Sequence, residues 1–307
     1  MNIDKAEGLF FGLAIGDAMG APVEFKDPNT FPRVVDFQGG GKFNLEPGEW
    51  TDDTAMALCL AEALSETSEL DSKKLLDLFL KWIMEGHHTT RGKAIGIGKQ
   101  TFKVLLNYRK NGDLVSPFTA SKYSGNGALM RLGPVAIKYY YSLNLTQKYA
   151  EQSAVTTHSS AESLQTARLF GGVLNRLLNN SSKEELADFI RQPNNHSKHA
   201  AMQNILTLNL EAMDKSNSGY APLSLEAAIH AFFTTNTFED GLLQVVNNGM
   251  DSDTVGAIYG QMAGAYYGMK AIPKNWVQGL KHLDLLQSSL KTLILSTENN
   301  NEKNKGR

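Results

Sequence analysis

Apolar side chains recur at three- and four-residue spacing in six stretches of the chain, which is the period of an amphipathic helix. The spacing predicts helices over residues 54–66, 72–85, 163–178, 183–192, 199–213 and 275–295. Residues that favour helix starts, Asp71-Ser72 and Ser181-Ser182, precede two of them. Strand-like alternation is rare: residues 31–40 (FPRVVDFQGG) are compatible with a short strand or an extended loop. The sequence therefore predicts an all-α fold.

The chain has no proline- or serine-rich linker and no repeat of fixed period, so we expect one all-α domain over residues 1–296. Two polar stretches, 191–199 and 215–224, are expected at the surface. Residues 297–307 (TENNNEKNKGR) contain no apolar side chain, and we expect this tail to be disordered.

The composition is that of an ordinary soluble globular protein, because 42% of the 307 residues are apolar and 20% are charged, with a formal net charge of −2. Without a basic run or a positive net charge, neither nucleic acid nor an anionic membrane is an expected partner. No apolar run approaches the ~18 residues of a membrane span. The single cysteine, Cys59, excludes an internal disulfide and is typical of a reducing compartment. We therefore expect a cytoplasmic protein.

Glycines recur every fourth residue at Gly12, Gly16 and Gly20. On a helix this spacing leaves one face bare, so that another backbone can approach closely, although each glycine costs up to about 1 kcal/mol of helix stability. Tight helix packing accounts for these glycines by themselves. Glu24 follows Pro22, in a segment too irregular for a helix interior.

Three oxygen-bearing side chains, Thr51, Asp52 and Asp53, stand directly before the helix predicted at residue 54. The start of a helix needs one such side chain to accept its free N–H groups, so at least one carboxylate is left over. Adjacent carboxylates repel each other, and burying them requires a cation. By itself, such a cluster is more typical of a helix cap than of a metal site.

A second cluster repeats this arrangement about 200 residues further along, where Asp251, Asp253 and Thr254 lead into an apolar stretch rich in small residues. Together the two clusters supply four carboxylates and two hydroxyls. Such hard oxygen ligands are preferred by Mg²⁺, Mn²⁺ or Ca²⁺ over zinc or copper. These six groups are enough to hold two divalent ions, as in two-metal hydrolases, if the clusters meet in space. The spacing alone does not show that they do.

The Gly-Asn-Gly segment at 125–127 is expected to open a helix, where exposed backbone N–H groups can bind a phosphate or diphosphate. His158 lies among hydroxyl-bearing residues and, taken alone, is more typical of a hydrogen-bonded structural histidine than of a ligand contact. The pair His87-His88 and the histidines at 196 and 199 are expected to be exposed to solvent rather than to bind a metal.

Five features taken together resemble the ADP-ribosylglycohydrolase family: GDAMGAPVEF (16–25), EWTDDTAMALCLAEAL (49–64), GNGALMR (125–131), His158 with its serines, and MDSDTVGAIYGQMAGAYYG (250–268). The resemblance runs in the same order from about residue 5 to residue 270. It is strongest to bacterial members similar to dinitrogenase-reductase-activating glycohydrolase. It implies a compact orthogonal helical bundle with a binuclear Mg²⁺ or Mn²⁺ centre. It also implies hydrolysis of the glycosidic bond between ADP-ribose and an acceptor, often a protein arginine.

Carried over residue by residue, the resemblance implies that the metal ligands are Thr51, Asp52, Asp53, Asp251, Asp253 and Thr254. Glu24 matches a glutamate with a catalytic or gating role, so the expected catalytic residues are Glu24, Asp52 and Asp53. The residues expected to line the ADP-ribose pocket are Gly125, Asn126, Gly127 and His158. Met250 is a departure, since many relatives have glycine or aspartate there, but it removes no ligand.

Cleavage of an anomeric C–N or C–O bond builds oxocarbenium character on the ribose. Two cations can hold the vicinal ribose hydroxyls and a water and lower the pKa of that water, while Glu24 takes its proton or stabilises the developing positive charge. The expected partner is an ADP-ribosylated protein, with arginine as the first choice of acceptor. Serine, another acceptor or a small ADP-ribosyl metabolite stay open. So do a non-catalytic ADP-ribose binder on the same fold, a phosphoesterase that cuts the diphosphate, and the oligomeric state.

Overall fold

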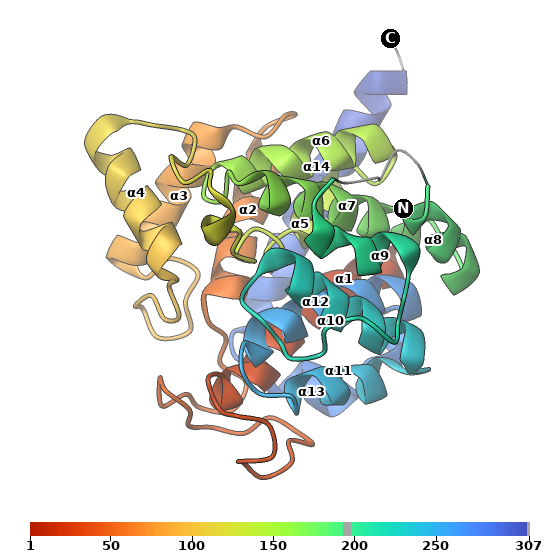
Figure 1. The fold of residues 1–307 in the computed structure, drawn as a ribbon. Helices are drawn as coiled ribbons and strands as arrows, with labels where there is room; N and C mark the ends of the chain where they lie inside the picture. The colour runs from red at the N-terminus through yellow and green to blue at the C-terminus, as the bar shows by residue number, and fades with distance from the viewer. Residues whose placement is uncertain (193–197, 306–307) are drawn as a thin grey trace.

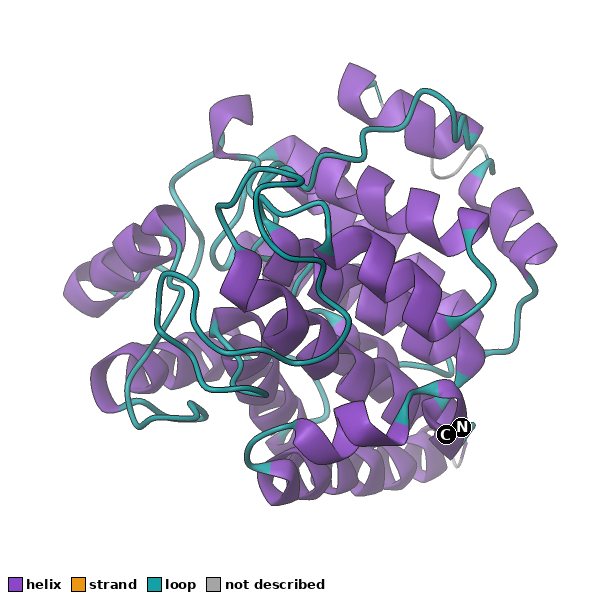
Figure 2. Cartoon of the chain, turned by 90° about the horizontal axis from the view of Figure 1, so that it is seen from below, coloured by secondary structure: helices purple, strands orange, loops and turns teal. Residues whose placement is uncertain are grey.

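The computed structural model describes residues 1–192 and 198–305, which form a bundle of α-helices joined by loops (Figures 1 and 2). Within these residues no strand occurs, and the pairing between Gly40 and Leu45 is an isolated bridge. The predicted all-α fold is confirmed. The α-helices of the described part are α1 Ile3–Gly20, α2 Asp52–Glu66, α3 Ser72–Glu85, α4 Lys99–Asn111, α5 Gly133–Lys138, α6 Leu143–Val155, α7 Ala161–Leu178, α8 Lys183–Ile190, α9 Gln203–Thr207, α10 Ala221–Thr234, α11 Phe238–Val246, α12 Ser252–Tyr267, α13 Lys274–Gly279 and α14 Leu283–Lys305.

Four of the six predicted helices are present close to their predicted bounds, as α2, α3, α7 and α8. Residues 275–295 are divided between α13 and α14, because the backbone is extended at Leu280 and left-handed at His282. Residues 31–40 form a loop rather than a strand. The stretch 215–224 is a loop only as far as residue 220, where α10 follows.

The prediction of one helix over residues 199–213 is wrong. Only α9 is α-helical there, and a single 3₁₀ turn at Ala200–Met202 precedes it. Leu208 ends α9 because it takes left-handed backbone angles, with φ at 51°, and its N–H donates to the carbonyl of Ile205. Part of the neighbouring stretch 191–199, including the histidine at 196, lies outside the described residues.

Helix α14 continues to Lys305, which differs from the disordered tail expected from residue 297. Leu290, Leu293 and Thr297 are buried and anchor this helix in the core. The last two residues of the chain lie outside the described part, and the domain boundary at 296 stays a prediction.

Helices α1 and α12 lie side by side at the centre of the fold and pack backbone against backbone (Figure 1). A Cβ atom on Gly16 would lie 2.6 Å from the backbone nitrogen of Ala257, and one on Gly12 would lie 2.9 Å from the carbonyl carbon of Gly260. Ordinary contact begins near 3.4 Å, so a side chain at either position would push the helices apart. The close approach predicted from the glycine spacing is confirmed. None of the described helices combines the length and the apolar character of a membrane span.

Candidate functional site

The packing of α1 against α12 brings the two acidic clusters together. At the end of α1, a Cβ atom on Gly20 would lie 2.5 Å from the backbone nitrogen of Asp253, and the Ser252 hydroxyl donates to the Gly20 carbonyl at 3.0 Å. Glu24 therefore follows α1 directly beside the start of α12. Asp52 of the first cluster and Asp251 and Asp253 of the second cluster line one cavity, so the two clusters meet in space.

The start of α2 is capped by Asp17, a residue of α1. This buried carboxylate accepts hydrogen bonds from the backbone N–H groups of Thr51 and Thr54, both at 3.0 Å. It also accepts from the two threonine hydroxyls, at 2.8 and 2.7 Å. The expectation that one of residues 51–53 caps the helix is therefore wrong, because a remote aspartate already satisfies its N–H groups. Both Asp52 and Asp53 are left for another role.

Two carboxylate oxygens in the cluster are buried without a hydrogen-bond partner among the described residues. They are Glu24 Oε2 and Asp53 Oδ1, and both side chains are nearly inaccessible to solvent. Carboxylate oxygens of Glu24, Asp251 and Asp253 lie within 4.8 Å of one another. Buried polar atoms without a partner are rare in folded proteins, and each one is costly. An arrangement of this kind calls for a cation.

The pKa values of these carboxyl groups point the same way. Burial, with repulsion from Asp52 and Asp251, raises the pKa of Glu24 to about 8, and the charge of Lys42 only partly opposes the shift. Burial, with repulsion from Asp17, raises the pKa of Asp52 to about 7. The pKa values of the carboxyls at 53 and 253 are raised for the same reasons. A divalent ion would supply the missing positive charge, so the residues present fit a metal centre.

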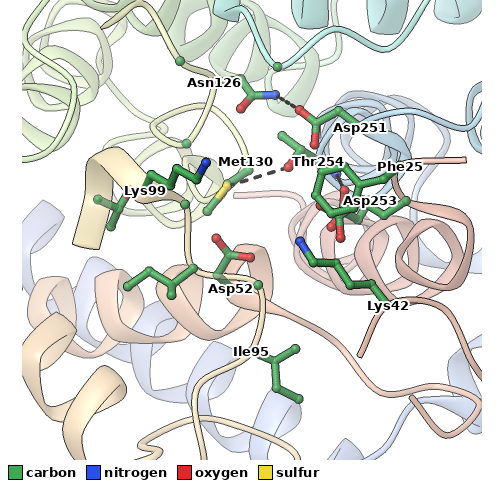
Figure 3. A pocket seen from close by; sticks show the side chains of 18 of the residues that line it. Phe25, Lys42, Asp52, Ile95, Lys99, Asn126, Met130, Asp251, Asp253 and Thr254 are labelled. Atoms are coloured by element: carbon green, nitrogen blue, oxygen red, sulfur yellow. Dashed lines mark hydrogen bonds between the residues drawn. The ribbon is translucent and has the colours of Figure 1, made fainter. Parts of the chain in front are cut away.

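The cluster opens into a cavity of about 1280 Å³, large for a small-molecule site. In Figure 3, Asp52 faces Asp253 and Thr254 across this cavity, while Lys42 and Lys99 reach in from opposite sides. The lining combines the carboxylates with a loop that leads into α4, and it also contains the segments 125–127 and 216–219. The cavity is therefore lined by a group of carboxylates, with lysine side chains elsewhere on its wall.

The Gly-Asn-Gly segment does not open a helix. The residues after it form successive turns, and α5 begins only at Gly133. The backbone N–H of Asn126 donates to the Gly219 carbonyl, while its side-chain amide donates to Asp251 Oδ2 at 2.6 Å and to Ser224 Oγ at 2.9 Å. The expected helix start is thus wrong, since the backbone turns back to meet the loop before α10. Asn126 holds a carboxylate of the second cluster in place.

The ring of His158 is held by a chain of hydrogen bonds. Nη2 of buried Arg131 donates to Thr157 Oγ1 at 2.8 Å, and this oxygen lies 2.8 Å from Nδ1 of His158. The guanidinium uses one lone pair of this hydroxyl, and no other acceptor for the Thr157 hydrogen occurs among the described residues. A Thr157 hydroxyl that donates to Nδ1 satisfies both groups, which places the imidazole hydrogen on Nε2. Burial, with the charge of Arg131, lowers the pKa of His158 to about 3. His158 is therefore a neutral donor on the cavity wall beside Gly125 and Gly127.

Comparison with known proteins decides the family. The family model described as ADP-ribosylglycohydrolase matches residues 2–303. The chain belongs to the ADP-ribosylglycohydrolase family. It is 37% identical over 287 residues to the ADP-ribosylarginine hydrolase Tri1 of Serratia proteamaculans (strain 568), covering 91% of this chain and 76% of that protein.

Other members of the family are similar over almost their whole length. The ADP-ribosyl-[dinitrogen reductase] glycohydrolase of Rhodospirillum rubrum is 29% identical, with 90% of each chain covered. A solved structure of an ADP-ribosylglycohydrolase-related protein complex superposes with a TM-score of 0.85 at 36% identity, covering 96% of this chain and 98% of that chain. The protein is thus a hydrolase of ADP-ribosylated substrates with an ADP-ribosylglycohydrolase fold.

In this member of the family, most residues singled out from the sequence line one cavity: Glu24, Asp52, Gly125, Asn126, Gly127, His158, Asp251, Asp253 and Thr254. Thr51 and Asp53 are buried behind that wall. Sequence reasoning missed Asp17 and Arg131. Both lie inside motifs that carried the family resemblance, Asp17 in GDAMGAPVEF and Arg131 in GNGALMR, but neither was given a role there. Asp17 also stands out as a charged residue inside an otherwise apolar stretch.

Proposed function

We propose that the protein hydrolyses the glycosidic bond of ADP-ribosyl-arginine on proteins and releases ADP-ribose. The observation that carries this proposal is the convergence of two acidic helix starts, with buried oxygens lacking partners, on one large cavity. Arginine as the acceptor is supported by the name of the Serratia relative. A small ADP-ribosyl metabolite is the second substrate class that the cavity suits. The reducing chemistry of a cytoplasm suits the buried, unpaired Cys59.

Two Mg²⁺ or Mn²⁺ ions are the proposed cofactors, and the proposed ligands are Thr51, Asp52, Asp53, Asp251, Asp253 and Thr254. The hydroxyl of Thr51 donates its hydrogen to Asp17 at 2.8 Å, which leaves the oxygen lone pairs of that hydroxyl for a cation. When bound, such ions lower the pKa of water and attract the oxygens of a sugar.

Glu24 is the proposed general base or charge stabiliser. It lies on the cavity wall beside Asp251 and Asp253, and one of its oxygens has no hydrogen-bond partner in the part of the chain that the structure describes. A carboxylate placed there can accept a proton from the attacking water. It can also oppose the positive charge that develops on the ribose as the bond breaks. Asp52 and Asp53 complete the proposed catalytic set.

The diphosphate is proposed to bind along the wall formed by Gly125, Gly127 and His158. The hydrogen on Nε2 of His158 is available there as a neutral donor. The two glycines make room for the His158 ring, since a Cβ on Gly127 would lie 2.7 Å from its Cε1. Lys99 also lies on the lining and offers a positive charge. Charged and neutral donors of this kind suit the oxygens of a diphosphate.

The test uses a protein substrate that carries radiolabelled ADP-ribose on arginine, with Mg²⁺, Mn²⁺ or EDTA. We expect release of intact ADP-ribose that EDTA abolishes and that the double variant Asp52→Asn/Asp53→Asn loses. Asp284→Asn, an exposed carboxylate on α14, is the matched control and should react at the wild-type rate. AMP as the product would identify a phosphoesterase instead. ADP-ribose affinity without turnover on arginine- or serine-linked substrates would identify a binding protein.

A further inference from the structure

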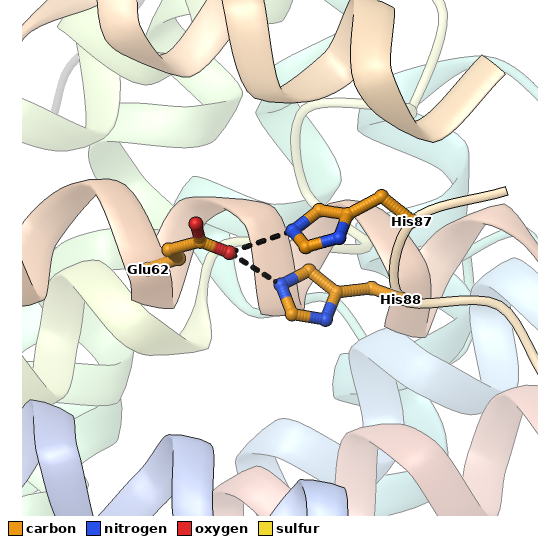
Figure 4. Close-up of side chains that lie close together, drawn as sticks. All are labelled: Glu62, His87 and His88. Carbon is orange, nitrogen blue, oxygen red and sulfur yellow. Dashed lines mark hydrogen bonds and ion pairs between the residues drawn. The ribbon is translucent and has the colours of Figure 1, made fainter. Parts of the chain in front are cut away.

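A second group of potential metal ligands lies away from the carboxylate cluster. Nε2 of His87 and Nε2 of His88 lie 2.8 and 2.7 Å from the same oxygen, Oε2 of Glu62. Figure 4 shows both rings directed at this oxygen from one side. The exposed fractions of the three side chains are 21%, 10% and 31%, so the expectation of solvent-exposed histidines is wrong. The fold converts a neighbouring His-His pair into a convergent cluster.

The backbone holds the two rings where they are. Helix α3 ends at Gly86, whose left-handed angles turn the chain back toward α2. His88 is also left-handed, with φ at 61°, and its carbonyl accepts a hydrogen bond from Nε1 of buried Trp50 at 3.1 Å. The ring centroids of His87 and His88 are 3.8 Å apart. The path of the chain after α3 therefore places the two rings side by side, with both Nε2 atoms near Glu62 Oε2.

We propose that Glu62, His87 and His88 form a binding site for a borderline divalent transition-metal ion such as Zn²⁺, separate from the carboxylate centre. Two imidazole nitrogens and one carboxylate oxygen are a donor set that zinc uses in proteins. Ligand bonds of about 2.0–2.2 Å place two ligand atoms at most about 4.4 Å apart. The three candidate atoms lie within 4.8 Å of one another, so small side-chain movements would let them share one ion. Partial exposure leaves room for water at the remaining positions.

Hydrogen bonds and ion binding are alternative states of this cluster. Without an ion, each ring donates an Nε2 hydrogen to the Glu62 carboxylate, which can only accept. With an ion, each ring would offer the Nε2 lone pair and keep a hydrogen on Nδ1. The Glu62 side chain, being partly exposed, can withdraw to admit the ion.

Imidazole ligands also set this site apart from the hard oxygens of the carboxylate cluster. Nitrogen donors favour zinc, nickel and copper, whereas carboxylates and hydroxyls favour magnesium and manganese. Two segments of the chain connect this site with the cavity. Glu62 lies on α2, the helix that begins with Asp52 and Asp53. The loop that follows His88 contributes residues between 91 and 99 to the cavity wall. An ion at this cluster would fasten the cavity loop to α2.

The test is a count of Zn²⁺ ions bound by the full chain in excess Mg²⁺, by competition with a chromogenic chelator. We expect one equivalent in the wild type and in Asp52→Asn/Asp53→Asn. Glu62→Gln and His87→Gln/His88→Gln should lose this Zn²⁺ equivalent. Mutation of a residue that only hydrogen-bonds to a metal ligand lowers metal affinity roughly 10–100-fold, and loss of a ligand itself should lower it further. His282→Gln, which alters a nearby exposed histidine, is the matched control and should keep the Zn²⁺ equivalent. Circular dichroism should give the same helix content in every variant.

Two results would overturn the proposal. One is the absence of a Zn²⁺ equivalent in the Mg²⁺-saturated wild type. The other is an equivalent that survives in His87→Gln/His88→Gln but disappears in Asp52→Asn/Asp53→Asn, since that ion would belong to the carboxylate cluster. Because the readout is metal content, the outcome does not depend on whether the protein acts on arginine-linked ADP-ribose. A second readout is the rate of tryptic cleavage after exposed Lys93, which Zn²⁺ should slow in the wild type and leave unchanged in the double-histidine variant.

Discussion

The contact between α1 and α12 predicts that Gly12→Ala destabilises the protein, although alanine is the better helix former. The added Cβ would lie 2.9 Å from the carbonyl carbon of Gly260 and closer still to its oxygen. Ordinary contact begins near 3.4 Å, and the obstacle is helix backbone rather than a mobile side chain, so the two helices must separate. Overpacking of this kind lowers the free energy of unfolding by about 1–3 kcal/mol. Because helix backbone cannot move aside as a side chain can, we expect a loss near the upper end of this range, about 3 kcal/mol.

The gain in helix propensity opposes this cost by about 1 kcal/mol, which leaves a net loss of about 2 kcal/mol in the free energy of unfolding. Urea unfolding followed by circular dichroism measures that quantity. Gly98→Ala is the matched control, because nothing lies within 4 Å of the Cβ added there, and its effect should stay below about 1 kcal/mol. Gly260→Ala should resemble Gly12→Ala.

The double variant Gly12→Ala/Gly260→Ala sharpens the test. Once one methyl group has separated the helices, the second meets less resistance, so the double variant should lose less stability than the sum of the single losses. Equal stability of Gly12→Ala and Gly98→Ala, or strict additivity in the double variant, would refute the backbone-contact reasoning.

Three further predictions concern the site. Asp17→Asn should destabilise the protein by about 2–6 kcal/mol in urea unfolding, since two of its buried donors lose an acceptor. Asp71→Asn, at the exposed cap of α3, should cost less than about 0.5 kcal/mol, since asparagine caps equally well. Thr157→Val should weaken ADP-ribose binding about 10-fold in calorimetry, because it breaks the link that orients His158. In EDTA, the melting temperature should fall as pH rises from about 5 to about 8. Burial raises the folded-state pKa of Glu24 from 4.5 to about 8, so the folded protein binds the proton more tightly than the unfolded chain.

Controls and contrary outcomes are specific to each prediction. If Asp17→Asn and Asp71→Asn lowered the free energy of unfolding equally, the buried cap that Asp17 provides to α2 would stabilise the fold no more than an ordinary exposed cap. Thr156→Val removes a buried neighbouring hydroxyl that donates to the Ser153 carbonyl, and it should leave ADP-ribose affinity unchanged. The fall in melting temperature should shrink in Glu24→Gln and on addition of Mg²⁺. A pH profile that neither of them changes would contradict the account of the carboxylate cluster.

Helix prediction succeeded where a helix has one apolar and one polar face. Helices α3 and α8 bury one side and expose the other, so their three- and four-residue spacing is visible in the sequence. The same spacing misled at residues 199–213, where a left-handed Leu208 interrupts the helix without any glycine or proline to mark it. Helix α10 was missed because it is buried on most sides and its pattern has little contrast.

The sequence by itself determined the chemical inventory of the site, because carboxylates, hydroxyls and glycines identify hard-metal ligands and places of close approach wherever they lie. Its motifs also carried the resemblance to the ADP-ribosylglycohydrolase family. Tertiary structure alone decided which groups meet. The glycine contact of α1 with α12 joins clusters about 200 residues apart, Asp17 takes over the cap that frees Asp52, and the turn after α3 brings two histidines to Glu62. The spacing of residues along the chain shows the period of a helix and which residues share its face. The contacts between distant segments depend instead on which helices can pack closely in the folded protein.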